Sequence, residues 1–173
     1  MGSRPTNRLG TISSTPSGGS AISYGYSHDN RNRRTAAVLA DGRYWDYGYN
    51  DRGEVISGIQ KLPDDSPIKG YGFGYGFDSI GNRTISAVDG ASGQRQTSYV
   101  ANQVNQYSSI ASPGFEYLIG SAATNATVTA NWTPEGNPPP ALQPGDIVQA
   151  LRQGSRWYLE LGVDNDPAPV WRT

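Results

Sequence analysis

The 173-residue sequence contains no cysteine, and several other residue types are scarce. Without cysteine there is no disulfide framework, no thiolate metal site and no cysteine nucleophile. Strong helix formers are few, with four Glu, two Lys and one Met, which disfavours helical bundles and coiled coils. No apolar run reaches the roughly 18 residues of a membrane-spanning helix, so the sequence predicts no membrane span.

The sequence also has no large excess of positive or negative charge. The chain has 14 basic and 15 acidic residues, which gives a net charge of −1 at pH 7. This balance provides no general attraction to nucleic acid or to anionic membranes, and neither is predicted as a partner. Most of the basic residues are arginines, which suit carboxylate pairing and stacking on aromatic rings better than lysines do.

Glycine, proline and tyrosine, by contrast, are abundant, at 22, 12 and 11 residues. This composition favours short strands joined by tight turns. Aromatic residues make up 10% of the chain, which is too many for a fully disordered protein. The sequence therefore predicts an all-β fold built from antiparallel hairpins.

A short pattern recurs in the first part of the chain. An Asp or Asn follows an aromatic-rich stretch, and Gly or Asn stands three residues later. The pattern residues are Tyr26, Asp29, Asn32, Tyr49, Asn50, Gly53, Phe77, Asp78, Gly81, Asn102 and Asn105. The anchors Asp29, Asn50, Asp78 and Asn102 lie 21, 28 and 24 residues apart, and Asn7-Arg8 looks like the tail of one more copy. Such periodicity predicts a stack of similar units.

Each unit is predicted to contain two antiparallel strands and two turns. The first Asp or Asn of a turn accepts backbone N–H groups, and the last residue tolerates the left-handed conformation. Before the turn, rings at alternate positions, such as Trp45, Tyr47 and Tyr49, lie on one face of a strand. Asp41-Gly42 and Asp89-Gly90 predict two-residue turns at the other end. Because a lone hairpin is marginally stable, the units should form one continuous curved sheet.

The segment 77–84, Phe-Asp-Ser-Ile-Gly-Asn-Arg-Thr, resembles the YD-repeat, or Rhs (rearrangement hot spot), family. The resemblance covers roughly residues 4 to 110 and departs from the family pattern at His28, Asn50 and Ala101-Asn102. It implies a β-ribbon that spirals into a hollow shell, in large exported bacterial proteins that often enclose a toxin. It also implies a secreted or cell-surface location, and neighbouring repeats or chains of the same sheet as partners. The resemblance also suggests that the repeats bind carbohydrate.

The repeat pattern lapses after about residue 112. We therefore expect two regions, with β-hairpin repeats in 1–112 and a second β-rich segment in 113–173. In the second region, residues 126–132 alternate like a strand, 133–145 form a Pro-rich loop, and 147–163 suggest a hairpin. This small sheet is expected to cap the repeats or pack against them.

No catalytic residue, metal site or cofactor is predicted. The single histidine, His28, occupies the aromatic position of a repeat, which favours a packing or turn role over a catalytic one. Asp64-Asp65 and the pair Asp164 and Asp166 lack the ligand spacing of a Ca²⁺ loop, so solvated turn carboxylates are favoured there.

The aromatic rows support two functional hypotheses. Packed within the sheet, the rings are the core of a structural repeat module without chemistry of its own, and this interpretation is favoured. Left exposed, Trp45, Tyr47, Tyr49 and Tyr75 would stack against sugars in a carbohydrate- or cell-surface-binding module, with a glycan as partner. The first hypothesis predicts that Tyr47→Ala costs about 3 kcal/mol or more of stability.

Overall fold

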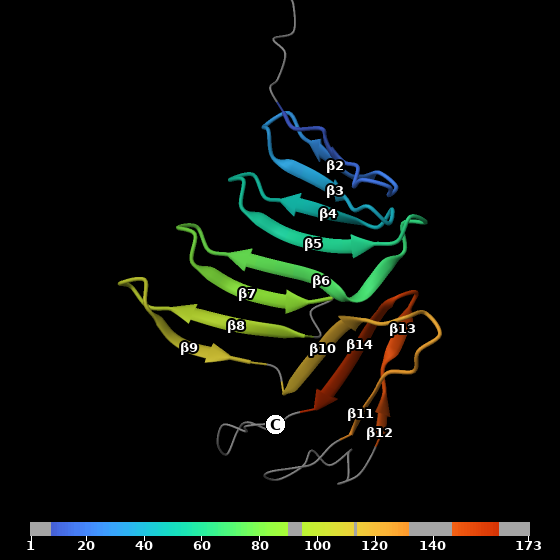
Figure 1. Ribbon diagram of the computed structural model, residues 1–173. Coiled ribbons are helices and arrows are strands. Elements are labelled where there is room, and N and C mark those ends of the chain that lie inside the picture. Colours follow the sequence, from blue (N-terminus) through green and yellow to red (C-terminus); the bar gives the residue numbers. More distant parts are fainter. Residues whose placement is uncertain (1–7, 90–94, 113, 132–146, 163–173) are drawn as a thin grey trace, which may run out of the picture.

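The computed structural model describes residues 8–89, 95–112, 114–131 and 147–162, and these residues form an all-β structure without helices. Nine strands make one large antiparallel sheet in the order β1 to β9, so that each strand pairs with its neighbours in sequence. Figure 1 shows this sheet as a twisted stack of hairpins, with a smaller sheet of β10, β14 and β13 beside its lower half, where it contacts β6. In the part of the chain that the structure describes, the outer edges of β1 and β9 have no partner strand.

The strands of the large sheet are β1 (Thr11–Ser14), β2 (Ile22–His28), β3 (Arg34–Val38), β4 (Tyr44–Tyr49), β5 (Val55–Lys61), β6 (Pro67–Phe77), β7 (Arg83–Val88), β8 (Gln96–Ala101) and β9 (Tyr107–Ala111). The remaining strands are β10 (Phe115–Ser121), β11 (Thr129–Asn131), β12 (Ile147–Gln149), β13 (Leu151–Gln153) and β14 (Arg156–Gly162). The described residues form no helix that is long and apolar enough to cross a membrane.

Four turns at one end of the large sheet share one geometry. In the first, Asp29 Oδ1 accepts the backbone N–H groups of Arg31 and Arg33, at 2.8 and 2.9 Å. The same two bonds form in the turns that begin at Asn50, Asp78 and Asn102. The fourth residues are Asn32, Gly53, Gly81 and Asn105, with φ of 65°, 88°, 92° and 62°. Each turn is thus a three-residue hairpin loop that ends in a left-handed residue and a bulge.

At the other end of the sheet, the predicted two-residue turn at Asp41-Gly42 is wrong. The N–H of Leu39 donates to the carbonyl of Arg43, and the N–H of Gly42 donates to the carbonyl of Leu39. A two-residue Asp-Gly turn needs positive φ at both residues, but only Gly42, at 82°, has it. The same three-residue turn geometry therefore occurs at both ends of the large sheet.

The two-residue turn predicted at Asp89-Gly90 is also wrong. The strand register places Ala87 opposite Gln96, so the connection between β7 and β8 is much longer. Asp89 has a φ of 66° and accepts the backbone N–H of Gly70 at 2.5 Å. Gly90 lies outside the described residues.

The two predicted regions lie in different sheets, because β9 ends the large sheet and β10 begins the small one. The strand expected at 126–132 is shorter, since β11 contains three residues. The segment expected to form one hairpin at 147–163 divides: β12 pairs with β11, while β13 and β14 pair across Gly154-Ser155. The Pro-rich loop at 133–145 lies outside the described residues.

Strand β6 connects the two sheets through a close backbone approach. Within it, Gly70 has a φ of 79°, and the Tyr158 ring of β14 lies against its Cα. A Cβ added at Gly70 would lie 2.1 Å from the Cδ2 atom of that ring. Beside it, the Tyr71 hydroxyl donates to the carbonyl of Gly120 at 3.1 Å. These contacts hold the small sheet on the first half of β6.

Polar side chains complete this junction. The Gln153 side chain accepts the N–H of Lys69 at 2.6 Å and donates to the carbonyl of Pro67 at 3.0 Å, as a neighbouring strand would. Glu160 accepts hydrogen bonds from Arg95 at 2.8 Å and from the Tyr158 hydroxyl at 2.5 Å. Burial and the bond to Glu160 raise the pKa of Tyr158.

The apolar core is small and divided between the sheets. Its buried members among the described residues are Ala37, Ile68, Tyr71, Ala87, Ala150, Tyr158, Leu159 and Leu161. In the large sheet, Ile68 and Tyr71 belong to β6, close to the junction. The rest of that sheet is largely a single layer, so turn and strand hydrogen bonds contribute much of its order.

Candidate functional site: the aromatic face and the turn ladder

One face of the large sheet carries most of its aromatic rings. In the register, Tyr26 and Trp45 stand on either side of Ala37, and Tyr47 and Phe73 on either side of Gly58. Because side chains alternate along strands, these residues share one face. We call it the aromatic face; its rings are Tyr26, Trp45, Tyr47, Tyr49, Phe73, Tyr75 and Tyr99.

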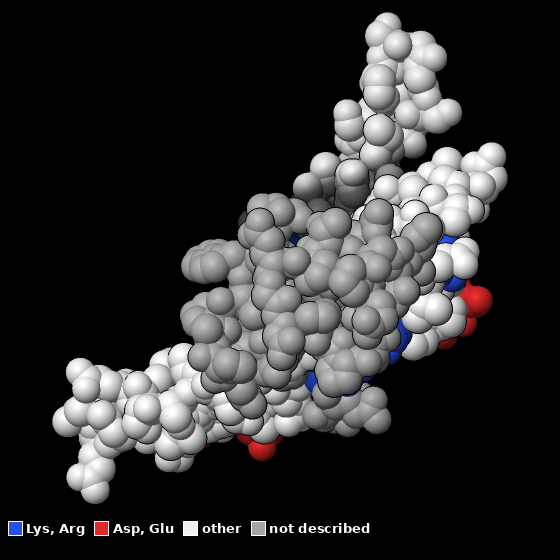
Figure 2. All heavy atoms as spheres, turned by 90° about the horizontal axis from the view of Figure 1, so that it is seen from below, with Lys and Arg blue, Asp and Glu red and all other residues white. Residues whose placement is uncertain are grey.

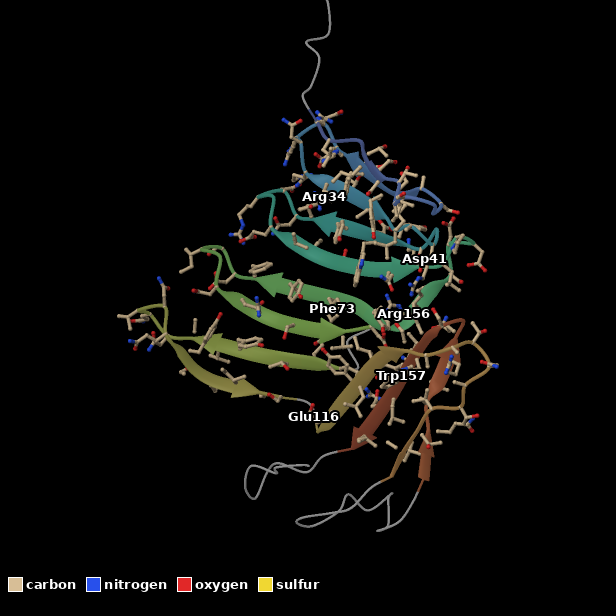
Figure 3. The ribbon with its side chains drawn as sticks, viewed as in Figure 1. Arg34, Asp41, Phe73, Glu116, Arg156 and Trp157 are labelled. Carbon is tan, nitrogen blue, oxygen red and sulfur yellow. The ribbon has the colours of Figure 1, made fainter. Side chains whose placement is uncertain are left out.

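Three of the rings stack on one another. Trp45 lies 6.3 Å from Tyr47 and 6.0 Å from Phe73 between ring centroids, with interplanar angles of 9° and 20°. Two of these rings, Tyr47 and Trp45, lie over the backbone of Gly58, where an added Cβ would be 3.5 and 4.0 Å from them. Figure 3 shows Phe73 on β6 near the middle of the sheet. The stack therefore spans β4 to β6 across one intervening strand.

The four residues predicted to stack against a ligand are all half-buried, namely Trp45, Tyr47, Tyr49 and Tyr75. Burial raises the pKa of Tyr47. The Tyr49 hydroxyl donates to the carbonyl of Arg34 at 2.8 Å. These four rings are neither fully buried nor fully exposed. Part of each ring packs against the sheet or its neighbours, and part stays accessible to solvent.

Cations on the aromatic face stack on its rings, and sequence reasoning did not single them out. Arg34 lies 4.5 Å from the Tyr26 ring centroid, and Arg83 lies 5.2 Å from that of Tyr75. Both arginines come two residues after the left-handed residue of a turn. Each is the first residue of the strand that leaves the turn, and this shared position in the repeats could have identified both from the sequence.

The strands of the large sheet carry no acidic side chain on this face, although Glu116 of β10 lines a pocket together with Tyr75 and Arg83. Asp46 is the only acidic residue in strands β1 to β9, and it alternates with Trp45 and Tyr47, so it lies on the opposite face. There it pairs with Lys61 at 2.6 Å. Seen from below, the described surface shows only small groups of charged side chains at its margins (Figure 2).

Side chains link each of the four turns to the next, forming what we call the turn ladder. Arg33 of the first turn donates to the carbonyl of Asn50 at 3.0 Å. Arg52 of the second donates to the carbonyl of Asp78 at 2.5 Å. In the third, Asn82 donates to Asn105 Oδ1 at 3.4 Å.

Arg8 extends this ladder toward the N-terminus. It donates to the carbonyl of Asp29 at 2.8 Å, as Arg33 donates to the next turn. Arg8 and Arg33 also occupy the same position in the sequence pattern, each directly after an Asn. The contact therefore agrees with an additional repeat ending at Arg8, while Asn7 itself lies outside the described residues.

The residues of the recurring sequence pattern lie either in the four turns or in the strands that precede those turns. Asp29, Asn32, Asn50, Gly53, Asp78, Gly81, Asn102 and Asn105 form the four turns. Tyr26, Tyr49 and Phe77 lie in the strands that lead into them. The pattern thus combines a turn with the ring that precedes it.

Turn carboxylates make stability depend on pH. Hydrogen bonds from the Asn82 side chain and from backbone N–H groups lower the pKa of Asp78, outweighing partial desolvation. A carboxyl with a lowered pKa stabilises the fold above its unfolded value of about 3.9. That contribution is lost as the pH falls toward the folded-state pKa.

We predict that Asp78→Asn reduces the acid sensitivity of the fold. Asn50 and Asn102 already perform the same turn role, so the variant keeps the acceptor for both backbone bonds. Between pH 5 and 3, its melting temperature should fall less than that of the wild type. Asp51→Asn is the control in the neighbouring turn and should retain the wild-type slope. Parallel slopes for Asp78→Asn and wild type would contradict the prediction.

The other candidate polar residues lie in turns or strand ends. His28 is half-buried opposite Arg34 at the end of β2. Asp64 accepts the N–H of Ser66 at 3.0 Å, and Asp65 is a left-handed turn residue with a φ of 69°. Asp164 and Asp166 lie outside the described residues. Within the described part of the chain, no group of three His, Cys, Asp or Glu side chains could hold a metal ion.

The groups of the aromatic face are suited to non-covalent contacts. This face offers aromatic rings, guanidinium groups and hydroxyls on an open sheet, which are groups that bind by stacking and hydrogen bonding. No protein-family model matches the sequence, and no curated protein matches it either. The argument about function therefore depends on the residues and their geometry.

Proposed function

We propose that this chain is a structural β-repeat module of an exported bacterial Rhs-like protein, a stretch of sheet wall that encloses or presents other material. The turn ladder carries this proposal. The turns share a geometry, and each is bonded to the next, from Arg8 to Asn105. Bonds of this kind between successive turns fix how hairpins stack, which suits an extended wall.

The open edges support the partners proposed with this function, which are neighbouring repeats or chains of the same sheet. Among the described strands, β1 pairs only with β2, and β9 pairs only with β8. All five residues of β9 are exposed, and the strand carries no charge or proline of the kind that protects an edge. Backbone groups on that edge are available for another strand.

A second candidate is a carbohydrate- or cell-surface-binding module that uses the aromatic face. The observation that favours it is the partial exposure of Trp45, Tyr47, Tyr49 and Tyr75. Rings that stay accessible on a sheet surface can stack against sugar rings.

Tyr47→Ala tests the structural function. Tyr47 is half-buried and stacks on Trp45, so the loss should be smaller than for a fully buried ring. We expect a decrease of about 2 kcal/mol in the free energy of unfolding, from lost burial and stacking. Urea denaturation followed by circular dichroism measures it.

Tyr24→Ala is the matched control, because Tyr24 is 39% exposed. It should change stability by less than about 1 kcal/mol. Equal and negligible losses for both variants, together with loss of glycan retention by Tyr47→Ala alone, would reject the structural function in favour of the binding one.

A further inference from the structure

A pocket lies between the aromatic face and strand β10 of the small sheet. Its volume is about 470 Å³. Its lining includes two rings of β6, two arginines of the large sheet's side, and a carboxylate and a ring of β10, namely Phe73, Tyr75, Arg83, Arg95, Glu116 and Tyr117. In Figure 3, Phe73 lies on β6 and Glu116 lies at the beginning of β10. We call it the Arg83 pocket.

Arg83 provides a positive charge in this pocket. Its guanidinium lies 5.2 Å from the ring centroid of Tyr75 and 6.0 Å from that of Tyr99. Among the described residues, no carboxylate forms an ion pair with it. Stacking orients a planar guanidinium and leaves the N–H donors along its edge open. Arg83 can therefore hold a phosphate or a carboxylate through two parallel hydrogen bonds.

Glu116 provides a negative charge in the same pocket. Its side chain is exposed, and no cation of the described residues forms an ion pair with it. Arg95, the other cation of the lining, is bonded to Glu160 at 2.8 Å. Arg83 and Glu116 do not neutralise one another, because their charged atoms are more than 4.0 Å apart. The pocket thus holds two separated charges of opposite sign.

This pair of charges favours a ligand that also carries both signs. An anion bound to Arg83 would lie near the carboxylate of Glu116, which opposes it. A cation bound to Glu116 would meet the guanidinium of Arg83 in the same way. A zwitterion with separated charges places each of them beside its opposite. The pocket therefore suits a zwitterion better than a simple anion or cation.

The rings indicate which cationic group the zwitterion carries. Phe73, Tyr75 and Tyr117 bring aromatic surface to the pocket that Glu116 lines. Aromatic faces attract quaternary ammonium groups, which have no N–H to donate. A primary ammonium group instead brings three donors that need acceptors. Rings beside a single carboxylate therefore suit a trimethylammonium group.

We propose that the Arg83 pocket binds phosphocholine, with the phosphate on Arg83 and the trimethylammonium group between Glu116 and the rings. This inference goes beyond both proposed functions and depends on neither, since it requires no sugar and no sheet wall. Phosphocholine is found as a soluble molecule and as a lipid head group. The same chemistry recognises both, and the test separates them.

The test is titration calorimetry of the full chain with phosphocholine. Glycerol phosphate, choline and phosphoethanolamine are the comparison ligands. Phosphocholine should bind more tightly than each of them, because the first two carry charge of one sign and the third lacks the methyl groups. Equal binding of phosphocholine and glycerol phosphate would overturn the inference, since the anion alone would then suffice. Absence of phosphocholine binding would also overturn it and would leave both proposed functions as they are.

Charge-removing variants locate the site. Arg83→Gln should reduce the affinity for phosphocholine at least about tenfold, the scale of a lost charged hydrogen bond. Glu116→Gln should reduce it at least about fivefold. The matched controls lie outside the pocket: Arg34 stacks on Tyr26 at the same position after the first turn, and Asp51 is an exposed acid of the second turn. Arg34→Gln and Asp51→Asn should each change the affinity by less than about twofold. Losses in these controls as large as in the pocket variants would contradict the proposed site.

Wild-type melting temperatures establish that the variants fold, and Glu116→Gln, which changes an exposed side chain, tests the pocket if Arg83→Gln does not fold. Cosedimentation with vesicles of phosphatidylcholine or of phosphatidylglycerol separates the two sources of phosphocholine. Retention on phosphatidylcholine alone supports the lipid head group as the ligand. Binding of free phosphocholine without retention on either vesicle supports the soluble molecule. Stronger retention on phosphatidylglycerol would overturn the inference, because an anionic lipid without a trimethylammonium group would then be preferred.

Discussion

Gly70→Ala is expected to destabilise the folded protein by about 3 kcal/mol, a large effect for the addition of one methyl group. Two costs combine at this position. Gly70 has a φ of 79°, where a residue with a Cβ is strained. The new Cβ would also lie 2.1 Å from a ring carbon of Tyr158 and 2.8 Å from Ile119, so the small sheet must move. Urea denaturation followed by circular dichroism measures the loss.

Gly154→Ala separates these two costs. Gly154 also has a positive φ, at 59°, but no atom lies within 4 Å of its added Cβ. It should lose only the conformational part, about 1 kcal/mol. Similar losses for both variants would show that the contact between β6 and Tyr158 does not limit the packing of the two sheets.

Tyr158→Ala is expected to produce the largest loss, about 4 kcal/mol, by analogy with truncations of buried aromatic residues. The side chain is 3% exposed, covers Gly70, and donates to Glu160 at 2.5 Å. Its removal would leave a cavity between the two sheets and withdraw a hydrogen bond from Glu160. Chemical denaturation gives the free energy of unfolding.

Tyr158→Phe is the control for the hydroxyl. It keeps the ring against Gly70 and loses only the bond to Glu160, which still pairs with Arg95. A loss of about 1 kcal/mol is expected. If the phenylalanine variant were as unstable as the alanine variant, the hydrogen bond rather than ring packing would hold this junction.

The turns could be predicted from the sequence because their bonds are local. Asp29 reaches N–H groups only two and four residues away, and Asn32 supplies the left-handed residue. The Asp41-Gly42 prediction failed for a related reason. A glycine after aspartate suits both a two-residue turn and a three-residue turn, and the strand register decides between them.

The aromatic face was also predictable in outline, because alternation assigns rings to one side of a strand whatever its neighbours are. How deeply the rings are buried was not. Trp45 meets Phe73 across Gly58, and that contact depends on the pairing of β4 to β6. The rings remain half-buried because the described small sheet packs mainly against β6 and leaves most of the large sheet a single layer.

By itself, the sequence determined the all-β class, the positions of four turns and the side of the sheet that carries the rings. Each follows from propensities or bonds within a few residues. Tertiary structure decided the turn ladder, the approach of Tyr158 to Gly70, and the stacking of Trp45 on Phe73. These contacts join residues distant in sequence, so their energies depend on strand register and on how the two sheets pack.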